Sequence, residues 1–510
     1  MTNYKKIAKE TAKVYFLTLL IIPLSFFVRM IYARNLTLVD YGLFYGLFAF
    51  FGFFEFLRDW GLTSATNYFA NKYIVHNKKS KVKTLFFIDW GFKLFMSVVI
   101  GIILYFLKGV IASGIYKNEG NIGYMFDFFI VFWIISAVYK SNYTFFSVLQ
   151  EQRISKFFEF LNWLLILIMS FVGFSFIQSY KVPVLAYLIS MIIVCFVSSF
   201  LFFMKHKDIF RAEFYKEKDL RKEVFKYASA VMIGGFSSIL LSHTDLFLIQ
   251  LFIGARNVAY YSSGFAAASL LMIIVVPLVL IIQPLFARLW HADKKAELIK
   301  LISFIFNNLL VFVLPFSMFF FAFSSQLVSL VYGSAFLESG IILKIFSFAF
   351  IIKIFNTFLF QILWSTGKPK QTSIIVVIAG VANIVLDLIL ISLFQNIGAA
   401  VATSICYLLI MVLCLKEVLK EITIKINILN NAKIVLSSLI FLIICFTLRG
   451  KIEFFDIGIA KYNFLLNGGS IFAISLVIYT ACLILFGIIT KQKIRVIMGL
   501  FKQKEIDRMT

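Results

Sequence analysis

Four basic side chains fall inside long apolar stretches of this sequence, at Arg29, Arg58, Lys140 and Lys353. A charge at the centre of a bilayer costs about 2.5–3.5 kcal/mol, so such residues face a bundle interior or a wet cavity. Arginine and lysine bind phosphate strongly when they are withdrawn from bulk water. The four cations therefore predict a cavity for an anionic substrate. For any single one of them, an interhelical salt bridge is the alternative.

Acidic side chains accompany these cations within the same stretches. Glu55 precedes Arg58 by three residues and Asp59 by four, so the three lie on one face of a helix. Asp245 lies in a later apolar stretch. We expect these acids either to hold the cations in place or to carry a coupling ion, H⁺ or Na⁺. Both roles fit the spacing.

The elements that must position these charges are membrane-spanning helices. Hydrophobic residues make up 61% of the chain, and its mean hydropathy is +0.95. A helix of about 20 apolar residues crosses a bilayer core of about 30 Å, and only helices and closed barrels satisfy their backbone there. The sequence predicts an all-α polytopic membrane protein with about 14 transmembrane helices, over 14–33, 41–64, 84–106, 123–149, 154–176, 182–204, 227–253, 258–286, 301–324, 339–365, 371–394, 397–418, 432–449 and 464–490.

The formal net charge of +24 could suggest a nucleic-acid partner, but the positions of the charges argue against one. Lys and Arg favour alternate connecting segments by roughly four to one, as the positive-inside rule requires. The basic excess therefore indicates how the chain is oriented in the membrane and that it is attracted to anionic lipids, and it does not indicate a nucleic-acid partner. We expect a multi-pass protein of the plasma or inner membrane with both termini cytoplasmic.

A short motif recurs along the chain and suggests a duplicated half. Ala-Arg-Asn closes the first predicted span at 33–35 and the seventh at 255–257. Under this alignment Lys140 and Lys353 fall within one position of each other, so each half presents a deep lysine. An even-span repeat places a substrate site between two lobes. The predicted domains are an N-lobe, a basic linker, a C-lobe and an appended pair of spans with a basic tail, over 1–204, 205–226, 227–418 and 419–510.

Several stretches carry a family resemblance. They read ARNLTLVDYGLFYGLF (33–48), DWGLTSA (59–65), SHTDLFLIQLFIGARNVAYYSSG (242–264), QILWSTGKPKQTS (361–373) and NIGAAVATSICYL (396–408). In this order and spacing they resemble the Wzx-type polysaccharide biosynthesis flippases, a branch of the multidrug/oligosaccharidyl-lipid/polysaccharide exporter superfamily. The resemblance covers about residues 10–420.

The resemblance implies a V-shaped bundle of two lobes that works by alternating access. Such proteins move a polyprenyl-diphosphate-linked oligosaccharide between leaflets, and polysaccharide polymerase or assembly machinery can act beside them. Related flippases hold the diphosphate with arginines on the first two helices, near Arg29 and Arg58 here. Asp40 and Asp245 resemble acids of the family, whereas Lys353 is proposed from this sequence's own pattern.

Three other classes compete with the flippase. A cation-coupled multidrug antiporter of the same superfamily usually has 12 spans and a less basic cavity. A membrane glycan polymerase or transferase usually needs a larger outer loop with catalytic acids or His, and the predicted outer loops 107–122, 325–338 and 450–463 contain no His. No filter signature indicates a channel. We expect no enzyme activity, no metal site and no cofactor, because neither a nucleotide loop nor metal-ligand spacing occurs.

Overall fold

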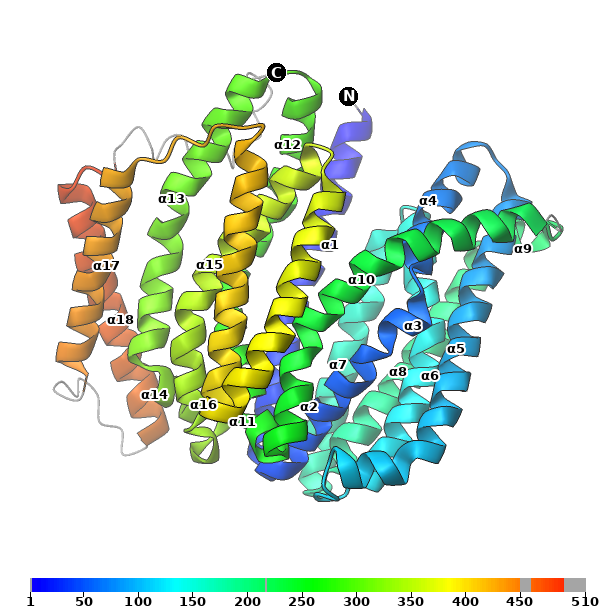
Figure 1. The fold of residues 1–510 in the computed structure, drawn as a ribbon, viewed down its shortest axis with the longest axis horizontal. Helices are drawn as coiled ribbons and strands as arrows, with labels where there is room; N and C mark the ends of the chain where they lie inside the picture. Colours follow the sequence, from blue (N-terminus) through cyan, green and yellow to red (C-terminus); the bar gives the residue numbers. More distant parts are fainter. Residues whose placement is uncertain (1, 216–217, 450–459, 490–510) are drawn as a thin grey trace. The chain divides into compact units, whose positions relative to one another are not determined.

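The structure is a computed structural model that describes residues 2–215, 218–449 and 460–489, and its ordered elements there are helices. Figure 1 shows them in chain order. They are α1 (Thr2–Asn35), α2 (Leu38–Phe53), α3 (Glu55–Asp59), α4 (Leu62–Val75), α5 (Lys79–Gly114), α6 (Ile122–Val148), α7 (Gln152–Phe176), α8 (Lys181–Lys205), α9 (Lys207–Arg211), α10 (Lys218–Ile253), α11 (Ala255–Ser269), η1 (Leu270–Ile274), α12 (Val276–His291), α13 (Lys295–Ala322), α14 (Ser324–Tyr332), η2 (Ser334–Phe336), α15 (Ser339–Ser365), α16 (Pro369–Leu419), α17 (Ile428–Leu448) and α18 (Ala460–Leu485).

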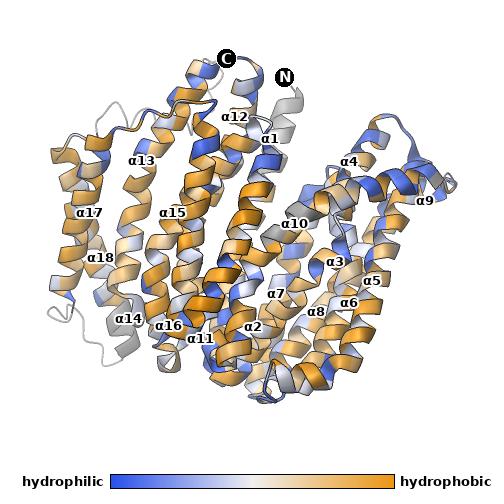
Figure 2. Ribbon diagram, viewed as in Figure 1, coloured by the Kyte–Doolittle hydropathy of each residue, from blue (hydrophilic) through white to orange (hydrophobic). Residues whose placement is uncertain are grey.

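The predicted all-α membrane class is confirmed. Within the described residues, eleven helices are long and apolar enough to cross a membrane. Figure 2 shows hydrophobic residues along these helices and hydrophilic ones gathered near many of their ends. The count of 14 spans stays a prediction.

Three places account for the difference between eleven and 14. The predicted spans 371–394 and 397–418 lie in one element, α16, which bends sharply at Gln395, a non-helical residue with φ 51° and ψ −131°. The apolar segment recognised in α10 among the described residues is short, Ile239–Ile253. The predicted span 258–286 is divided among α11, η1 and α12.

The predicted span 41–64 is also interrupted, and the interruption positions two site residues. Trp60 and Gly61 adopt left-handed backbone conformations, with φ of 46° and 74°, so α3 ends and α4 starts in a new direction. A Cβ on Gly61 would collide with the carbonyl oxygen of Ala228 in α10. Trp60 also donates from Nε1 to Ser229 Oγ (3.0 Å). These contacts hold α3, with Glu55 and Arg58, against α10.

The described contacts divide the chain into two compact units. Unit 1 comprises residues 1–266, 331–342 and 369–410, and unit 2 comprises 267–330, 343–368 and 411–510. These units differ in outline from the lobes expected from the sequence repeat. The lobe, linker and appended-pair boundaries were derived from that repeat and stay predictions.

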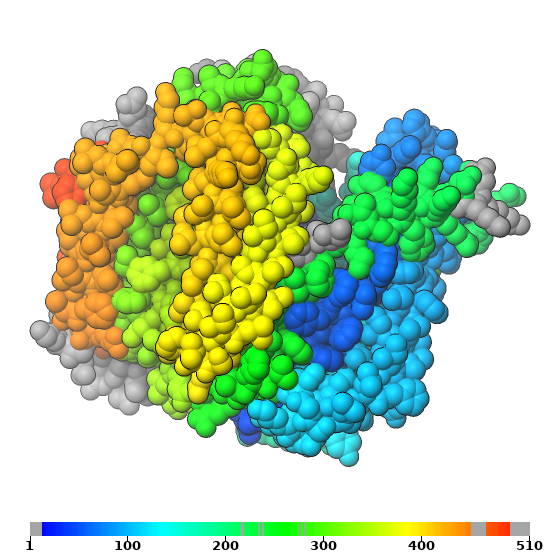
Figure 3. Space-filling view, in the orientation of Figure 1, coloured from blue at the N-terminus to red at the C-terminus, as the bar shows by residue number. Residues whose placement is uncertain are grey.

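Unit 1 is built around aromatic contacts between long helices. α5 packs on α6, α6 on α8, and α7 on both α1 and α8. Phe86 of α5 lies 4.9 Å from Phe145 and 5.1 Å from Phe202, between ring centroids. Green α10 crosses blue α2, as Figures 1 and 3 show. A Cβ on Gly42 of α2 would overlap the carbonyl of Ala255, so glycine permits this close approach.

Unit 2 contains the two helices that the sequence places after the repeat. α17 packs on α13 and on α18. Their shared core includes Leu314, Phe441 and Tyr479, and the Tyr479 hydroxyl donates to the carbonyl of Val311 (3.0 Å). A buried tyrosine hydroxyl in lipid needs such an acceptor, so this bond fixes α18 against α13.

Candidate functional site: a caged arginine and an acid pair

Arg29 of α1 lies among tyrosine rings in unit 1. Its guanidinium carbon stands 4.2 Å from the centre of the Tyr45 ring, and it interacts electrostatically with the hydroxyls of Tyr41, Tyr187 and Tyr332. We call these four tyrosines the tyrosine cage. Two of them come from α2, one from α8 and one from the end of α14, so four separate elements meet at one cation.

The tyrosine cage supplies no negative charge. Among the described residues, no carboxylate forms a salt bridge with Arg29. The hydroxyls of Tyr41, Tyr45 and Tyr332 are buried and interact within the site, Tyr41 with Arg29 and Tyr45 with Tyr41, but none has a well-aligned hydrogen bond to a described group outside it. The guanidinium and three phenols thus offer several donors, and no described carboxylate occupies them. That donor set suits an anion with several oxygen atoms, such as phosphate.

Arg58 lies in a very different environment. It is 2% exposed, and its Nη1 donates to the Trp133 carbonyl and to Ser136 Oγ, both at 2.9 Å. Its Nη2 donates to Glu55, and its guanidinium covers the Trp133 ring at 4.7 Å. Lys140 Nζ bonds the other oxygen of Glu55 at 2.7 Å. The structure therefore brings Glu55, Arg58 and Lys140 together, with Arg58 fixed between α3 and α6.

Because Arg58 is so fully engaged, its removal is expected to affect folding before transport. In Arg58→Ala, Glu55 loses a buried partner and keeps only Lys140, which should cost about 3 kcal/mol of unfolding free energy. The matched change Lys140→Gln removes a cation whose side chain is 47% exposed, which should cost at most about 1 kcal/mol. Thermal unfolding of both purified variants measures the difference, and equal midpoints would contradict it.

Asp59 belongs to a second charged network of unit 1. Its Oδ1 accepts from Lys93 Nζ (3.2 Å) and from the Thr63 backbone N–H (3.2 Å). The same Lys93 bonds Asp89 at 2.9 Å, and Asp89 also accepts from Thr66 (3.3 Å). These contacts join α3, α4 and α5, so the geometry of Asp59 is that of a structural ion pair.

Asp40 lies in the first turn of α2. Its carboxylate accepts from Thr37 Oγ1 (2.8 Å), and its backbone N–H donates back to the same oxygen (3.1 Å). This reciprocal pair caps the start of α2. The contacts of Asp40 thus account for it as a helix cap, and a coupling role for it stays a prediction.

Lys353 lies in unit 2, on α15. Its ammonium stands 4.7 Å from the centre of the Phe350 ring, one turn earlier on the same helix. The predicted pairing of Lys353 with Lys140 across a cavity stays a prediction, because the two residues belong to different units.

Asp245 is the centre of a buried polar cluster in unit 1. Its Oδ2 accepts hydrogen bonds from the Tyr261 hydroxyl and from Thr403 Oγ1, the latter at 2.5 Å. Asp387 of α16 faces Asp245 and interacts with it electrostatically. We call Asp245 and Asp387 the acid pair. The two residues are 7% and 0% exposed, respectively.

The acid pair is short of donors. Asp245 Oδ1 and both oxygens of Asp387 receive no hydrogen bond from another described residue, although the two carboxyls lie close enough to share a proton. The side-chain amide of Asn383, one turn before Asp387, also lacks a described partner. Two buried carboxylates that face each other repel unless a proton or a cation lies between them. The orphaned oxygens therefore fit a small cation or a shared proton. No group of three or more His, Cys, Asp or Glu in the described ranges could hold a metal ion.

Most of the residues that surround Arg29 and Asp245 were not predicted as site residues from the sequence. Asp387 was visible as an acid in an apolar stretch, and Asn383 one turn earlier strengthens that signal. Tyr261 and Thr403 carry no comparable signal, because single hydroxyls are common in membrane helices. The tyrosine cage was equally invisible, since its members are spread from residue 41 to residue 332.

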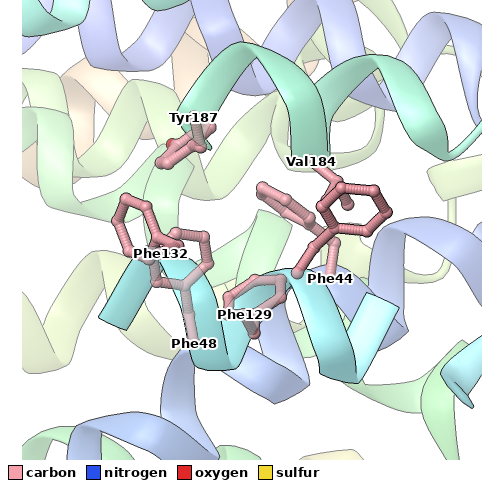
Figure 4. Close-up of a pocket in the computed structure, with 7 residues that line it drawn as sticks. Phe44, Phe48, Phe129, Phe132, Val184 and Tyr187 are labelled. Carbon is pink, nitrogen blue, oxygen red and sulfur yellow. The ribbon is translucent and has the colours of Figure 1, made fainter. Parts of the chain in front are cut away.

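A small gap beside the tyrosine cage is part of the packing. Figure 4 shows it between Phe44 and Phe48 of α2, Phe129 and Phe132 of α6, and Tyr187 of α8. Its volume is about 10 Å³, the lower limit for one ordered water. Because its walls are aromatic or aliphatic, this gap positions Tyr187 and does not hold a polar substrate.

Comparisons with known proteins agree with this architecture. The chain is 24% identical over 403 residues to the uncharacterized membrane protein MJ1068 of Methanocaldococcus jannaschii, covering 76% of this chain and 78% of that protein. It is 22% identical over 186 residues to the probable low-salt glycan biosynthesis flippase Agl15 of Haloferax volcanii, covering 36% and 39%.

Solved structures share the fold at low sequence identity. The lipid II flippase MurJ in an inward closed conformation matches with a TM-score of 0.72 and 16% identity, covering 92% of this chain and 99% of that one. An inward-facing multidrug resistance MATE family transporter of the MOP superfamily matches with a TM-score of 0.61 and 12% identity, covering 79% and 95%. These neighbours are flippases and transporters rather than enzymes.

The family model described as "Polysaccharide biosynthesis protein" matches residues 7–290, more than half of the chain. That range contains Arg29, Glu55, Arg58, Lys140 and Asp245, and it overlaps most of the stretch that carries the resemblance. The flippase-type transporter fold and this match agree, and the chain belongs to the polysaccharide biosynthesis protein family.

Proposed function

We propose that this protein is a flippase that moves a polyprenyl-(di)phosphate-linked oligosaccharide from the cytoplasmic to the outer leaflet by alternating access. The observation that carries the proposal is Arg29, a cation inside an apolar helix that lies in a tyrosine cage and pairs with none of the described carboxylates. A substrate with one or two phosphates would supply the anionic acceptor oxygens.

The chemistry of the tyrosine cage favours phosphate over a carboxylate or a halide. Guanidinium presents a planar fork of donors that matches two oxygens of a carboxylate or a phosphate. The phenols of Tyr41 and Tyr45 add donors from a second direction, and only the phosphate has further oxygens to accept them. In a low-dielectric site each of these bonds is stronger than in water. The sugar would then occupy wet space, while the prenyl chain stays in lipid.

An ion bound at the acid pair would couple transport to the gradient of that ion. Asp245, Asp387, Thr403 and Asn383 would hold a Na⁺ ion or a proton, whose flow down its gradient would bias the exchange between inward and outward states. The chain's own part in this step is to keep two carboxylates and two neutral polar groups buried together. An ion there removes their mutual repulsion.

The same proposal places the protein in a plasma or inner membrane with both termini cytoplasmic. Its partners would be the lipid-linked oligosaccharide, the surrounding lipids and the polymerase or assembly machinery that consumes the sugar outside. No nucleic acid takes part.

The leaflet position of lipid-linked glycans tests the proposal. Cells depleted of the protein should accumulate polyprenyl-diphosphate-linked glycan on the cytoplasmic face, shielded from an external glycan-modifying enzyme, and should lose surface glycan. Unchanged sidedness with short, unpolymerised glycan outside would instead indicate a membrane glycan polymerase or transferase.

A cation-coupled multidrug antiporter is the second candidate. The acid pair and the likeness to MATE transporters favour it, because an ion-coupled exporter of cations needs buried acids. A depleted strain with normal glycan sidedness and increased sensitivity to cationic drugs would support this function and refute the flippase.

A further inference from the structure

A groove opens where one end of the apolar part of α1 meets α7 and α8 in unit 1. It has a volume of about 610 Å³. Its charged lining residues are Lys13 and Arg153, and the rest of its wall is apolar, formed by Phe16, Leu17, Ile154, Phe157 and Leu201. Lys13 begins the apolar part of α1, Arg153 is the second residue of α7, and Leu201 lies in the last turns of α8. Three helix ends therefore meet at one membrane level.

The acids at the start of α7 beside the groove are already paired, so they do not neutralise Arg153. Glu151, the nearest acid before Arg153, bonds Lys205 at 2.7 Å and His206 at 3.3 Å, so it is already paired. Glu159 on the same helix pairs with Lys156 at 2.7 Å. Arg153 itself is exposed. The predicted topology puts this end at the cytoplasmic surface, where anionic headgroups lie.

The wall of the groove is suited to an acyl chain. Phe16 is 63% exposed and Phe157 48%, which is the behaviour of side chains that face lipid rather than protein. The helices that form this wall are packed together, because α7 contacts both α1 and α8. A chain lying here would cover apolar surface without moving a helix.

We propose that this groove binds one anionic bilayer lipid, with its phosphate between Lys13 and Arg153 and one chain against Phe16 and Phe157. Basic pockets between transmembrane helices at the cytoplasmic side bind anionic headgroups in this way. The site is separate from the tyrosine cage. Lys13 and Arg29 are 16 residues apart on α1, about 24 Å along a helix, so one phosphate cannot occupy both places. The inference does not depend on the transported substrate.

Native mass spectrometry of the full chain, released from zwitterionic micelles and titrated with phosphatidylglycerol, tests the proposal. Each basic residue near an anionic headgroup contributes about fivefold in affinity. The double variant Lys13→Gln/Arg153→Gln should therefore bind the first phosphatidylglycerol about 25-fold more weakly. The matched control Lys72→Gln/Arg221→Gln removes one lysine and one arginine from other predicted cytoplasmic segments and should bind like the wild type.

Titrations with two other ligands test whether the groove recognises a whole anionic lipid or phosphate alone. Phosphatidylcholine with the same chains should bind the wild type at least tenfold more weakly, because it lacks the net negative charge. Inorganic phosphate should also bind at least tenfold more weakly, because it lacks the acyl chains. Equal phosphatidylglycerol affinity in the wild type and the groove variant would overturn the proposal. So would displacement of phosphatidylglycerol by an equimolar polyprenyl phosphate, which would assign the groove to the substrate carrier. If the double variant does not purify, Arg153→Gln alone gives the same test at about fivefold.

Discussion

An Arg29→Gln variant is expected to lose transport by about 10–100-fold while reaching the membrane at the wild-type level. A hydrogen bond to a charged group contributes about 1.5–3 kcal/mol, and the substrate phosphate would lose its only ionic partner in the tyrosine cage. The fold should tolerate the change, because Arg29 has no carboxylate to leave unpaired.

Two milder variants test separately the guanidinium group of Arg29 and one hydroxyl of the tyrosine cage. Arg29→Lys keeps the charge but loses the planar fork, so transport should fall less than in Arg29→Gln. Tyr45→Phe keeps the ring under the guanidinium and removes one buried hydroxyl, which should cost about 2–10-fold. The exposed Arg34, which donates to the carbonyl of Val331, provides the matched control as Arg34→Gln.

The measurement is the rate of glycan translocation in reconstituted vesicles or the sidedness of glycan in cells carrying each variant. Normal translocation in Arg29→Gln would refute the tyrosine cage as the phosphate site. Loss in Arg29→Gln with equal loss in Arg34→Gln would indicate that any change on α1 is harmful, which would also refute a specific role.

The contrast between Arg29 and Arg58 shows how far sequence reasoning reaches. Both are arginines in early apolar stretches, and the sequence treats them alike. The spacing of Glu55 and Arg58 correctly predicts their ion pair, because i and i+3 positions are fixed by helix geometry. Trp133 and Ser136, which complete the environment of Arg58, are about 75 residues away. Local periodicity carries no information about that contact.

Helix positions were predictable to the extent that hydropathy determines them. The stretch 339–365 matches α15 residue for residue, because its apolar run has clear ends. The break at Trp60 and Gly61 was missed, since a left-handed tryptophan has no sequence signal and the turn depends on packing against Ala228. The bend at Gln395 falls between two predicted spans, so its position was expected although its sharpness was not.

An Asp387→Asn variant is expected to be more stable than the wild type in ion-free buffer and to have lost ion-coupled transport. The amide has the shape of a protonated carboxyl, so it removes the repulsion within the acid pair. It also offers a donor to Asp245 Oδ1, which receives no hydrogen bond from another described residue. Satisfying such a buried group contributes about 1–3 kcal/mol.

The thermal unfolding midpoint, measured with NaCl, with KCl and without added salt, tests whether the acid pair binds an ion. An ion that binds only the folded protein adds about 2.7 kcal/mol at 100 times its Kd. If Na⁺ couples, it should raise the wild-type midpoint beyond KCl and leave Asp387→Asn and Asp245→Asn unchanged. If H⁺ couples, Na⁺ should have no effect, and the pH dependence of wild-type transport should disappear in both variants.

The control is Asp127→Asn, which removes an acid of α6 that pairs with Lys108 at 2.8 Å and is 41% exposed. It should keep the ion response, because a half-exposed surface pair contributes at most about 1 kcal/mol and does not confine an ion. Wild-type transport and ion dependence in Asp387→Asn would contradict the assignment. The stability gain is the more telling result, because a purely structural aspartate would lose stability when replaced.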